Sequence, residues 1–367
     1  MKAVLLLDDG AIFEGRALGA EGEAFGEVVF NTSMTGYQEV LTDPSYEGQI
    51  VAMSYPLIGN YGLTPDDDES GAAWLEGFVV REASPVRSNW RSTEDLGPWL
   101  ARHSVVGIQG IDTRALTRHL RINGARHGVV SSREQDVRSL ADRLARAPRI
   151  VGVDMVKTVT PRSSYPWSEG VAGAPVSPAR HHVVVIDCGV KRSILRHLVS
   201  AGCRLTVVPA GTGAGEILAM RPDGLVISNG PGDPEPVGYV VETARALLGR
   251  LPIFGICLGH QMLGLALGGR TYKLKFGHHG GNHPVKDLET GRIAITAQNH
   301  GFNVDMQSFA AAGTRATHVN LYDGTCEGLE NRELRLFSVQ YHPEAAPGPH
   351  DSAPLFGRFT AMMDGSR

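Results

Sequence analysis

A short apolar strand that runs into a glycine-flanked cysteine constrains this chain more than any other feature. Ile253 and Phe254 predict the strand, Gly255-Ile256-Cys257-Leu258-Gly259 follows, and the next residues have a helical pattern. A nucleophile between two glycines at a strand-to-helix turn is the nucleophile-elbow arrangement, here with Cys in place of Ser. The glycines are needed because a Cβ two residues before or after the nucleophile would clash with the neighbouring strand or helix.

The turn predicts a particular chemistry for Cys257. It exposes the sulfur above a helix N-terminus, which favours the thiolate and offers free N–H groups. A buried structural cysteine in a Gly-rich turn is the alternative, because free Cys is usually a core residue.

Size and charge narrow the class of protein. With 367 residues the chain is long enough for two domains with a core each. A formal net charge of −4 gives no electrostatic footprint for nucleic acid or an anionic membrane. No apolar run approaches the length of a transmembrane helix, and the one near Met1 is too short for a signal peptide. The 4 cysteines are scattered without metal-binding spacing, so we expect a reduced, cytoplasmic setting.

The pattern of strands and helices divides the chain into three parts. Residues 1–155 predict a mixed α+β domain, and residues 156–180, rich in Pro, Ser and Gly, predict a linker. Residues 181–367 alternate strands and helices, as expected for an α/β domain with a doubly wound, mostly parallel sheet. Sites in such sheets form at the carboxyl ends of strands, and Cys257 stands at such an end. The clearest elements in the first domain are strands at 2–7, 27–30 and 49–53, a helix at 114–122 after Asp112, and a helix after a capping box at 132–135.

The candidate base is His342, in the sequence Gln340-Tyr341-His342-Pro343-Glu344. A cysteine nucleophile needs a base and a group that orients it. His342 and Glu344 are two residues apart and would share a face if the preceding strand continued, so the carboxylate could orient the imidazole. A solvated His-Pro-Glu turn at a strand end is the alternative.

The candidate oxyanion loop is Ser228–Pro234, which contains Gly-Pro-Gly and also follows a predicted strand. Its glycines let the backbone approach a ligand and point N–H groups at developing charge. The N–H groups of Gly232 and Leu258 are the predicted pair. A phosphate-binding loop is disfavoured because the chain has no GxxxxGK[ST] or GxGxxG sequence, and a plain strand-to-helix turn is the remaining alternative.

Three further polar groups are candidates for binding a substrate or a metal ion. Gln261 lies one helical turn after Cys257 and could bind the polar end of a small substrate or simply face solvent. The stretch Gln298–Phe302 predicts a polar loop after a strand at 293–295, either a substrate rim or a plain connection. His278, His279 and His283 lack the Cys or helical His pair of a zinc site, so no metal is predicted.

Together these motifs resemble the triad-type (class I) glutamine amidotransferases. The resemblance rests on Gly-Ile-Cys257-Leu-Gly-His-Gln, the Gly-Pro-Gly loop upstream and His342-Pro-Glu344, which occur in this order between Asp187 and about Phe359. A finer resemblance is to the small-subunit family of carbamoyl-phosphate synthase. It rests on the stretches 274–284, 298–302 and 342–351, and on 30–39 and 43–46 in the first domain, so it spans nearly the whole chain.

The resemblance implies a role for individual residues. Cys257 would be the nucleophile, with His342 and Glu344 as its partners. Glutamine would be held by eight residues, of which Ser45 comes from the first domain: Ser45, Gly230, Gly232, Leu258, Gln261, Asn299, Gly301 and Phe302.

The resemblance also implies a reaction and a partner. The chain would hydrolyse L-glutamine through a Cys thioester and pass the ammonia to a large synthetase subunit, which would use ATP, Mg and bicarbonate to make carbamoyl phosphate for arginine or pyrimidine synthesis. No cofactor is expected in this chain itself. A stand-alone glutamine or γ-glutamyl hydrolase, an amidotransferase feeding another synthetase, and a non-catalytic scaffold are the alternatives.

Overall fold

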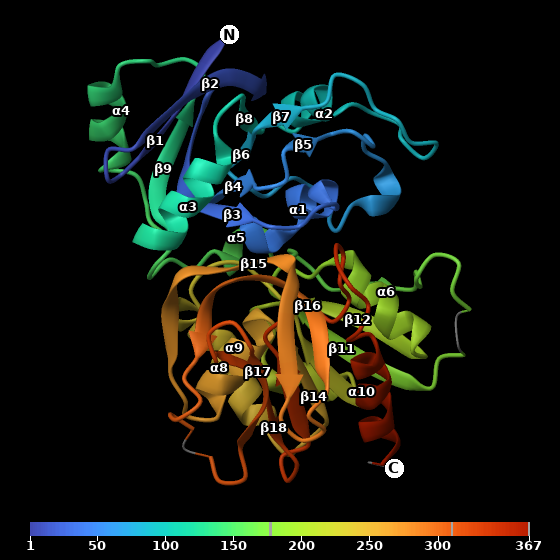
Figure 1. Cartoon of the computed structure of the whole chain (residues 1–367). Helices are drawn as coiled ribbons and strands as arrows, with labels where there is room; N and C mark the ends of the chain where they lie inside the picture. The colour runs from blue at the N-terminus through green and yellow to red at the C-terminus, as the bar shows by residue number, and fades with distance from the viewer. Residues whose placement is uncertain (176–177, 310, 366–367) are drawn as a thin grey trace. The chain divides into compact units, whose positions relative to one another are not determined.

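The computed structural model describes residues 1–175, 178–309 and 311–365 (Figure 1). They form two compact units. The first comprises Met1–Val153 and Lys275–Gly280, and the second comprises Asp154–Leu274 and Gly281–Arg367. The chain therefore returns to the first unit in the middle of the long strand β15 (Thr271–Asp287). The sequence did not predict this return, because residues 275–280 carry no signal of a domain change.

The first unit is built around a closed barrel, with strand order β1-β2-β8-β6-β4-β3-β9. Both faces of β1 are buried: Ala3, Leu5 and Leu7 pack with residues of other barrel strands, and Val4 and Leu6 pack with Leu140 and Leu144. The predicted strands at 2–7 and 49–53 agree with β1 and β4, whereas the closure of the barrel was not predicted. The strands are β1 (Lys2–Leu7), β2 (Ile12–Gly19), β3 (Glu23–Asn31), β4 (Gln49–Met53), β6 (Gly77–Val80), β8 (Val106–Gln109) and β9 (Arg126–Ser131), and β5 (Leu57–Ile58) pairs with β7 (Glu82–Ala83) in a separate sheet.

Side-chain caps decide where the helices of this unit begin. The Asp112 carboxylate accepts a hydrogen bond of 2.9 Å from the Ala115 N–H and so starts α3, as predicted. The predicted capping box at 132–135 is wrong. The helix begins later, after Asp136, because the Ser132 hydroxyl instead accepts a hydrogen bond from the Gly22 N–H. The helices are α1 (Tyr37–Thr42), α2 (Leu96–Arg102), α3 (Thr113–Asn123) and α4 (Val137–Leu144).

The second unit contains a ten-stranded sheet of order β10-β12-β11-β13-β14-β19-β18-β17-β15-β16. Its five central strands, from β12 to β19 in this order, are parallel, and the strands beyond β19 pair antiparallel where their registers are resolved. The predicted α/β class is confirmed. The further strands are β10 (Tyr165–Trp167), β11 (His181–Asp187), β12 (Cys203–Pro209), β13 (Gly224–Ile227), β14 (Ile253–Ile256), β16 (Ile293–Val304), β17 (Arg315–Asn320), β18 (Cys326–Asn331) and β19 (Leu336–Val339).

Helices cover both faces of the parallel strands. One apolar cluster joins α7, α8 and α9 to one face, and a second joins α6 and α10 to the other. Successive residues of one strand pack into the two clusters in turn: Val184 of β11 belongs to the first cluster and Val185 to the second. The helices are α6 (Arg192–Ser200), α7 (Ala214–Ala219), α8 (Gly238–Leu247), α9 (Leu258–Ala266) and α10 (Pro354–Asp364).

Residues 156–180 are more than the linker that their composition predicted. Val156 begins the short helix α5 (Val156–Val159) and is fully buried in the core of the second unit. Tyr165–Trp167 form β10, an antiparallel edge strand beside β12. Pro166 is tolerated there because an edge strand leaves one row of its backbone groups unpaired.

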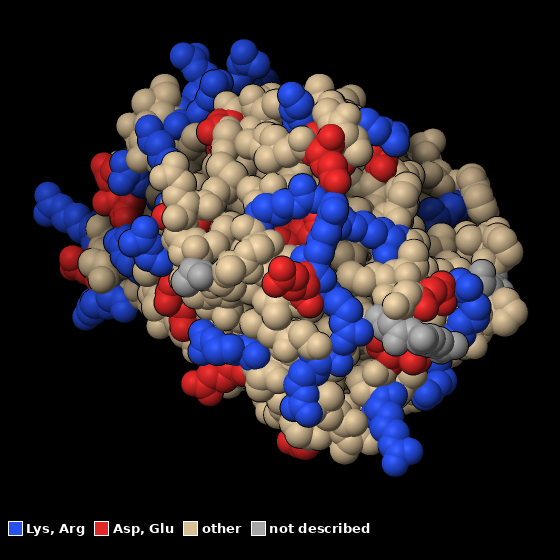
Figure 2. All heavy atoms as spheres, turned by 90° about the horizontal axis from the view of Figure 1, so that it is seen from below, with Lys and Arg blue, Asp and Glu red and all other residues tan. Residues whose placement is uncertain are grey.

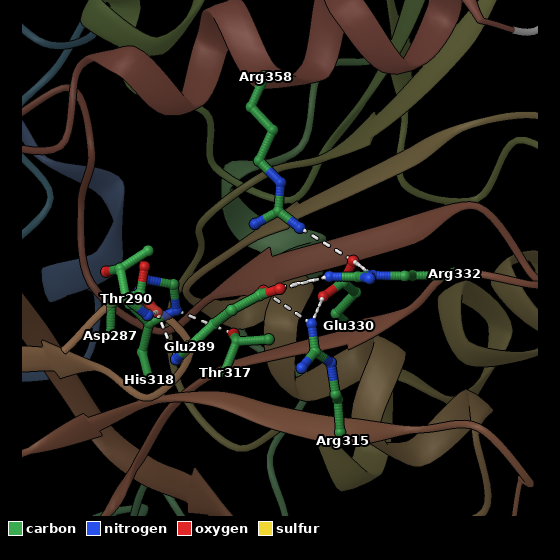
Figure 3. A network of polar contacts seen from close by, with 9 residues as sticks. All are labelled: Asp287, Glu289, Thr290, Arg315, Thr317, His318, Glu330, Arg332 and Arg358. Carbon is green, nitrogen blue, oxygen red and sulfur yellow. Dashed lines mark hydrogen bonds and ion pairs between the residues drawn. The ribbon is translucent and has the colours of Figure 1, made fainter. Parts of the chain in front are cut away.

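An ion-pair network ties α10 to the antiparallel part of the sheet (Figure 3). The Glu330 carboxylate of β18 pairs with the guanidinium groups of Arg315 at 2.8 Å, Arg332 at 2.9 Å and Arg358 at 3.2 Å. Arg358 also lies over the ring of Phe337, 4.2 Å from its centroid.

Basic and acidic side chains lie interspersed on the face seen in Figure 2. None of the helices among the described residues has both the length and the apolar character needed to cross a membrane.

Candidate active site

Cys257 stands at the carboxyl end of β14, between the parallel strands β13 and β19. Its backbone has φ 54° and ψ −103°, which a residue other than glycine rarely adopts, and it caps α9. The Cys257 N–H donates a 2.9 Å hydrogen bond to the Val339 carbonyl at the end of β19. The predicted strained turn from strand to helix is confirmed, but the predicted exposure of the sulfur is wrong, because Cys257 is 1% exposed and packs in an apolar cluster.

The two flanking glycines are required by close packing. A Cβ added to Gly255 would lie 2.7 Å from the Gly259 carbonyl oxygen. A Cβ added to Gly259 would lie 2.0 Å from the carbonyl oxygen of Ile227 in β13. The expected clash on both sides of the nucleophile is therefore present, and backbone atoms cause it.

His342 and Glu344 meet across a turn. The imidazole Nδ1 of His342 lies 2.7 Å from the Glu344 Oε1. The sequence argument had placed them on one face of a continuing strand, but β19 ends at Val339 and the chain turns. The contact between His342 and Glu344 was thus predicted, but the turn that brings the two side chains together was not. Both side chains are buried, at 3% and 1% of full exposure.

Lys191 completes a buried chain of charges. Its ammonium Nζ donates to the Glu344 Oε1 at 2.9 Å and to the Ala346 carbonyl at 2.6 Å. Sequence reasoning missed Lys191, because its partner lies 153 positions further along the chain. Its place in the loop after β11, at the carboxyl end of a parallel strand, was the available signal.

Interactions among the charges of Lys191, Glu344 and His342 determine which of these side chains are protonated. Burial raises the pKa of Glu344, but the cations of Lys191 and His342 outweigh it, so the net pKa is lowered. Burial lowers the pKa of His342, but the Glu344 carboxylate and the Cys257 side chain raise it, and the net direction is upward. The imidazolium form is therefore favoured close to the thiol. The other ring nitrogen, Nε2, is buried and makes no well-aligned hydrogen bond with any described residue.

The Gly-rich loop lies against the elbow. A Cβ added to Gly230 would lie 2.8 Å from the Leu258 Cδ2, so the glycine lets the loop reach α9. Gly232 adopts φ 80° and packs against Met155. Leu258 is the first residue of α9, where a backbone N–H has no acceptor within the helix. The predicted oxyanion donors are thus on adjoining segments.

Buried amides adjoin the sulfur. The Cys257 Sγ lies 3.6 Å from the Asn299 carbonyl oxygen and 3.7 Å from the Gln340 Nε2. The Gln261 Nε2 donates to the Phe302 carbonyl at 2.9 Å and to the Gln340 Oε1 at 3.1 Å. Gln261 therefore faces the site. Gln340 was not identified from the sequence, although a polar residue that ends the apolar run 336–339 was a signal.

The stretch Gln298–Phe302 is strand and not the loop that its polarity predicted. It continues β16, with Gln298, Asn299 and His300 all buried. Strand structure persists because polar partners exist inside: the Gln298 Nε2 donates to the Glu327 carboxylate at 3.0 Å. Asn299, Gly301 and Phe302 thereby keep fixed positions. Ser45 belongs to the first unit, where its N–H donates to the Asp43 carboxylate, and its role stays a prediction.

Comparison with known proteins gives the family. Residues 5–130 match the model of the carbamoyl-phosphate synthase small chain, CPSase domain, and residues 184–362 match that of the class-I glutamine amidotransferases. Three proteins named carbamoyl phosphate synthase small chain are similar to it. That of Syntrophotalea carbinolica is 57% identical (100% of this chain, 99% of the relative). Those of Chlorobaculum tepidum and Escherichia coli are 54% and 51% identical and cover 99% of this chain, with 98% and 97% of their own lengths matched. The chain therefore belongs to the carbamoyl phosphate synthase small chain family and carries a class-I glutamine amidotransferase domain.

Proposed function

We propose that this chain is the glutaminase subunit of carbamoyl-phosphate synthase, and that it hydrolyses L-glutamine to glutamate and ammonia. One observation carries the proposal. Cys257 sits on a strained elbow at the carboxyl end of β14, close to an imidazole that a buried carboxylate orients. The parallel strands with helices on both faces support the assignment as a doubly wound glutaminase domain.

The reaction follows from the residues in place. The Cys257 thiolate attacks the carboxamide carbon of glutamine, and the N–H groups of Gly232 and Leu258 stabilise the oxyanion. His342, held by Glu344, gives a proton to the leaving ammonia and leaves a γ-glutamyl thioester. The same imidazole then takes a proton from water, which attacks the thioester and releases glutamate. The overall change is glutamine plus water to glutamate plus ammonia.

The substrate contacts are proposed from the same set. Gln261 uses both N–H bonds of its amide on the Phe302 carbonyl and on Gln340, so its Oε1 remains to accept a hydrogen bond from the α-ammonium of glutamine. Gly230, Asn299, Gly301 and Phe302 supply further contacts with the substrate, and Ser45 adds one from the first unit.

A partner is needed for the complete reaction. The ammonia passes to a large synthetase subunit, which binds ATP and Mg and makes carbamoyl phosphate from bicarbonate. Family membership supports this partner, because the relatives are named as small chains. No cofactor is assigned to this chain, and we place the complex in the cytoplasm.

Replacing the nucleophile tests the proposal. In the intact complex with the large subunit, Cys257→Ser is expected to abolish carbamoyl phosphate synthesis from glutamine and to preserve synthesis from free ammonia. Loss of both activities would contradict the division of labour. High glutaminase activity of the chain alone, unchanged by the large subunit, would favour a stand-alone hydrolase. Failure of a glutamine-analogue electrophile to label Cys257 would favour a non-catalytic scaffold.

A further inference from the structure

We propose that Gln340 is a positioning residue for the nucleophile, whose amide N–H holds the Cys257 sulfur and stabilises its thiolate form. The expected effect of Gln340 on catalysis rests on the proposed function. The contact between Gln340 and Cys257 rests on the geometry of the site alone.

The contact joins two fully buried groups. Gln340 is 0% exposed and Cys257 is 1% exposed, and the Gln340 Nε2 lies 3.7 Å from the Cys257 Sγ. Solvent therefore does not compete for the amide. A buried amide N–H that donates to a charged sulfur gains more than one that donates to a neutral sulfur, because charge-assisted hydrogen bonds are the stronger class.

Neighbouring groups fix the direction in which the amide points. The Gln261 Nε2 donates to the Gln340 Oε1 at 3.1 Å, so the oxygen of Gln340 faces Gln261 and its NH₂ faces the sulfur. The main chain is held too, because the Gln340 N–H donates to the Glu327 carbonyl at 3.0 Å. Gln261 thus orients Gln340, and Gln340 orients Cys257.

The second neighbour of the sulfur explains why this donor matters. The Asn299 carbonyl oxygen, 3.6 Å away, can accept a hydrogen bond from a thiol S–H but repels a thiolate. Gln340 acts in the opposite sense, because its N–H attracts the thiolate. With Gln340 removed, the balance at the sulfur moves toward the neutral thiol.

Titratable side chains of other segments also lie around the sulfur. His342 lies close to it, with Glu344 and Lys191 behind the imidazole. His260, on α9, bonds Ser338 through Nδ1 at 2.9 Å, and burial lowers its pKa to about 3, so it stays neutral. The Gln340 side-chain amide donates to the Cys257 Sγ and carries no charge itself.

Alkylation of Cys257 by iodoacetamide at a series of pH values tests the proposal, because it needs neither glutamine nor the large subunit. We compare the full chain with Gln340→Met, which keeps the size and removes the donor, and with Gln340→Glu, which keeps the shape and replaces the NH₂ group by oxygen. The expected result is that the pH of half-maximal alkylation rises by about one unit in Gln340→Met and by more in Gln340→Glu. The kcat/KM for glutamine at pH 7 should fall about tenfold, mainly through kcat.

A matched control separates positioning from general loss of stability. Asn331 is also a fully buried amide, at the other end of the β18–β19 pair, where its Nδ2 donates to the Ala312 carbonyl and to the Thr314 hydroxyl at 3.0 Å. Asn331→Leu should lower the melting temperature and leave the alkylation profile unchanged. An unchanged profile in a folded Gln340→Met or Gln340→Glu, or an equal shift in Asn331→Leu, would overturn the proposal. A wild-type complex without glutaminase activity would instead refute the proposed function and leave the alkylation result standing.

Discussion

The Glu344 Oε1 accepts hydrogen bonds from two cations, 2.7 Å from the His342 Nδ1 and 2.9 Å from the Lys191 Nζ. One buried oxygen therefore joins the candidate base to a lysine from a distant loop.

Replacing Lys191 by Met should leave the buried Glu344 carboxylate with one cationic partner, His342, in place of two. We expect a loss of up to about 3 kcal/mol in the free energy of unfolding of the second unit, because part of the compensation of a buried charge is removed. Denaturant melts followed by circular dichroism measure it. Lys157→Met removes an exposed lysine of α5 and should change stability by less than about 0.5 kcal/mol. Equal losses in the two variants would contradict the importance of the buried pair.

The stabilising effect of Glu344 should be largest within a limited pH range and should fall at both lower and higher pH. Folding lowers the pKa of Glu344, so its contribution is complete above the unfolded pKa of about 4.3 and is lost as the pH falls. Folding raises the pKa of His342, so its contribution is complete below the unfolded pKa of about 6.5 and is lost as the pH rises. The difference in melting temperature between wild type and Glu344→Gln should therefore be largest between about pH 4.3 and 6.5.

The control for this pH series is Glu242→Gln, which removes an exposed carboxylate from α8. Its melting temperature should stay close to that of the wild type at every pH. A difference for Glu344→Gln that stays constant from pH 4 to pH 9 would show that the charges of the pair are not coupled to folding.

Adding one methyl group at Gly259 should disrupt the elbow. The new Cβ meets the Ile227 carbonyl 2.0 Å away, and backbone atoms cannot move aside as a flexible side chain can. We expect Gly259→Ala to lower the free energy of unfolding by at least about 3 kcal/mol and to abolish labelling of Cys257. Gly215→Ala, in α7, is the matched change, because no atom lies within 4 Å of its Cβ, and it should be neutral or stabilising by up to about 1 kcal/mol.

Glu330 should hold α10 in place through Arg358, and it also pairs with Arg315 of β17 and with Arg332 (Figure 3). We expect Glu330→Gln to lower the melting temperature by several degrees at neutral pH, because three guanidinium groups then lack their shared carboxylate. The pKa of Glu330 is lowered: burial raises it, but hydrogen bonds from Arg332 and Arg315 outweigh that effect. The loss should therefore shrink as the pH falls below about 4.3. A decrease in melting temperature of the same size at pH 3 would show that Glu330 stabilises through packing and not through its charge.

The features that depend on contacts between nearby residues could be predicted from the sequence. The elbow followed from residues within a few positions of Cys257, since Gly255 and Gly259 are needed by the turn itself. The α/β class followed from short apolar strands such as β11. The caps of Asp112 and Asp136 show the limit of this reasoning: one was identified and the other was assigned to Ser132.

What the sequence missed depends on residues far apart in the chain. Lys191 and Gln340 look ordinary until β11, β13, β14 and β19 join one parallel sheet and bring Glu344 and Cys257 to them. Gln298–Phe302 looked like a loop because its polar partners, such as Glu327, come from another strand. The closure of the barrel likewise depends on pairing between distant strands, such as β1 with β9.

The return of the chain within β15 has a consequence for any truncation. A fragment that begins at Asp154 would still contain Lys275–Gly280, which belong to the first unit. Phe276 would then lose its ring partner Phe30, whose centroid lies 5.8 Å away, and an aromatic side chain would be left uncovered. A single cleavage between Val153 and Asp154 therefore cannot yield a glutaminase fragment free of unmatched apolar surface.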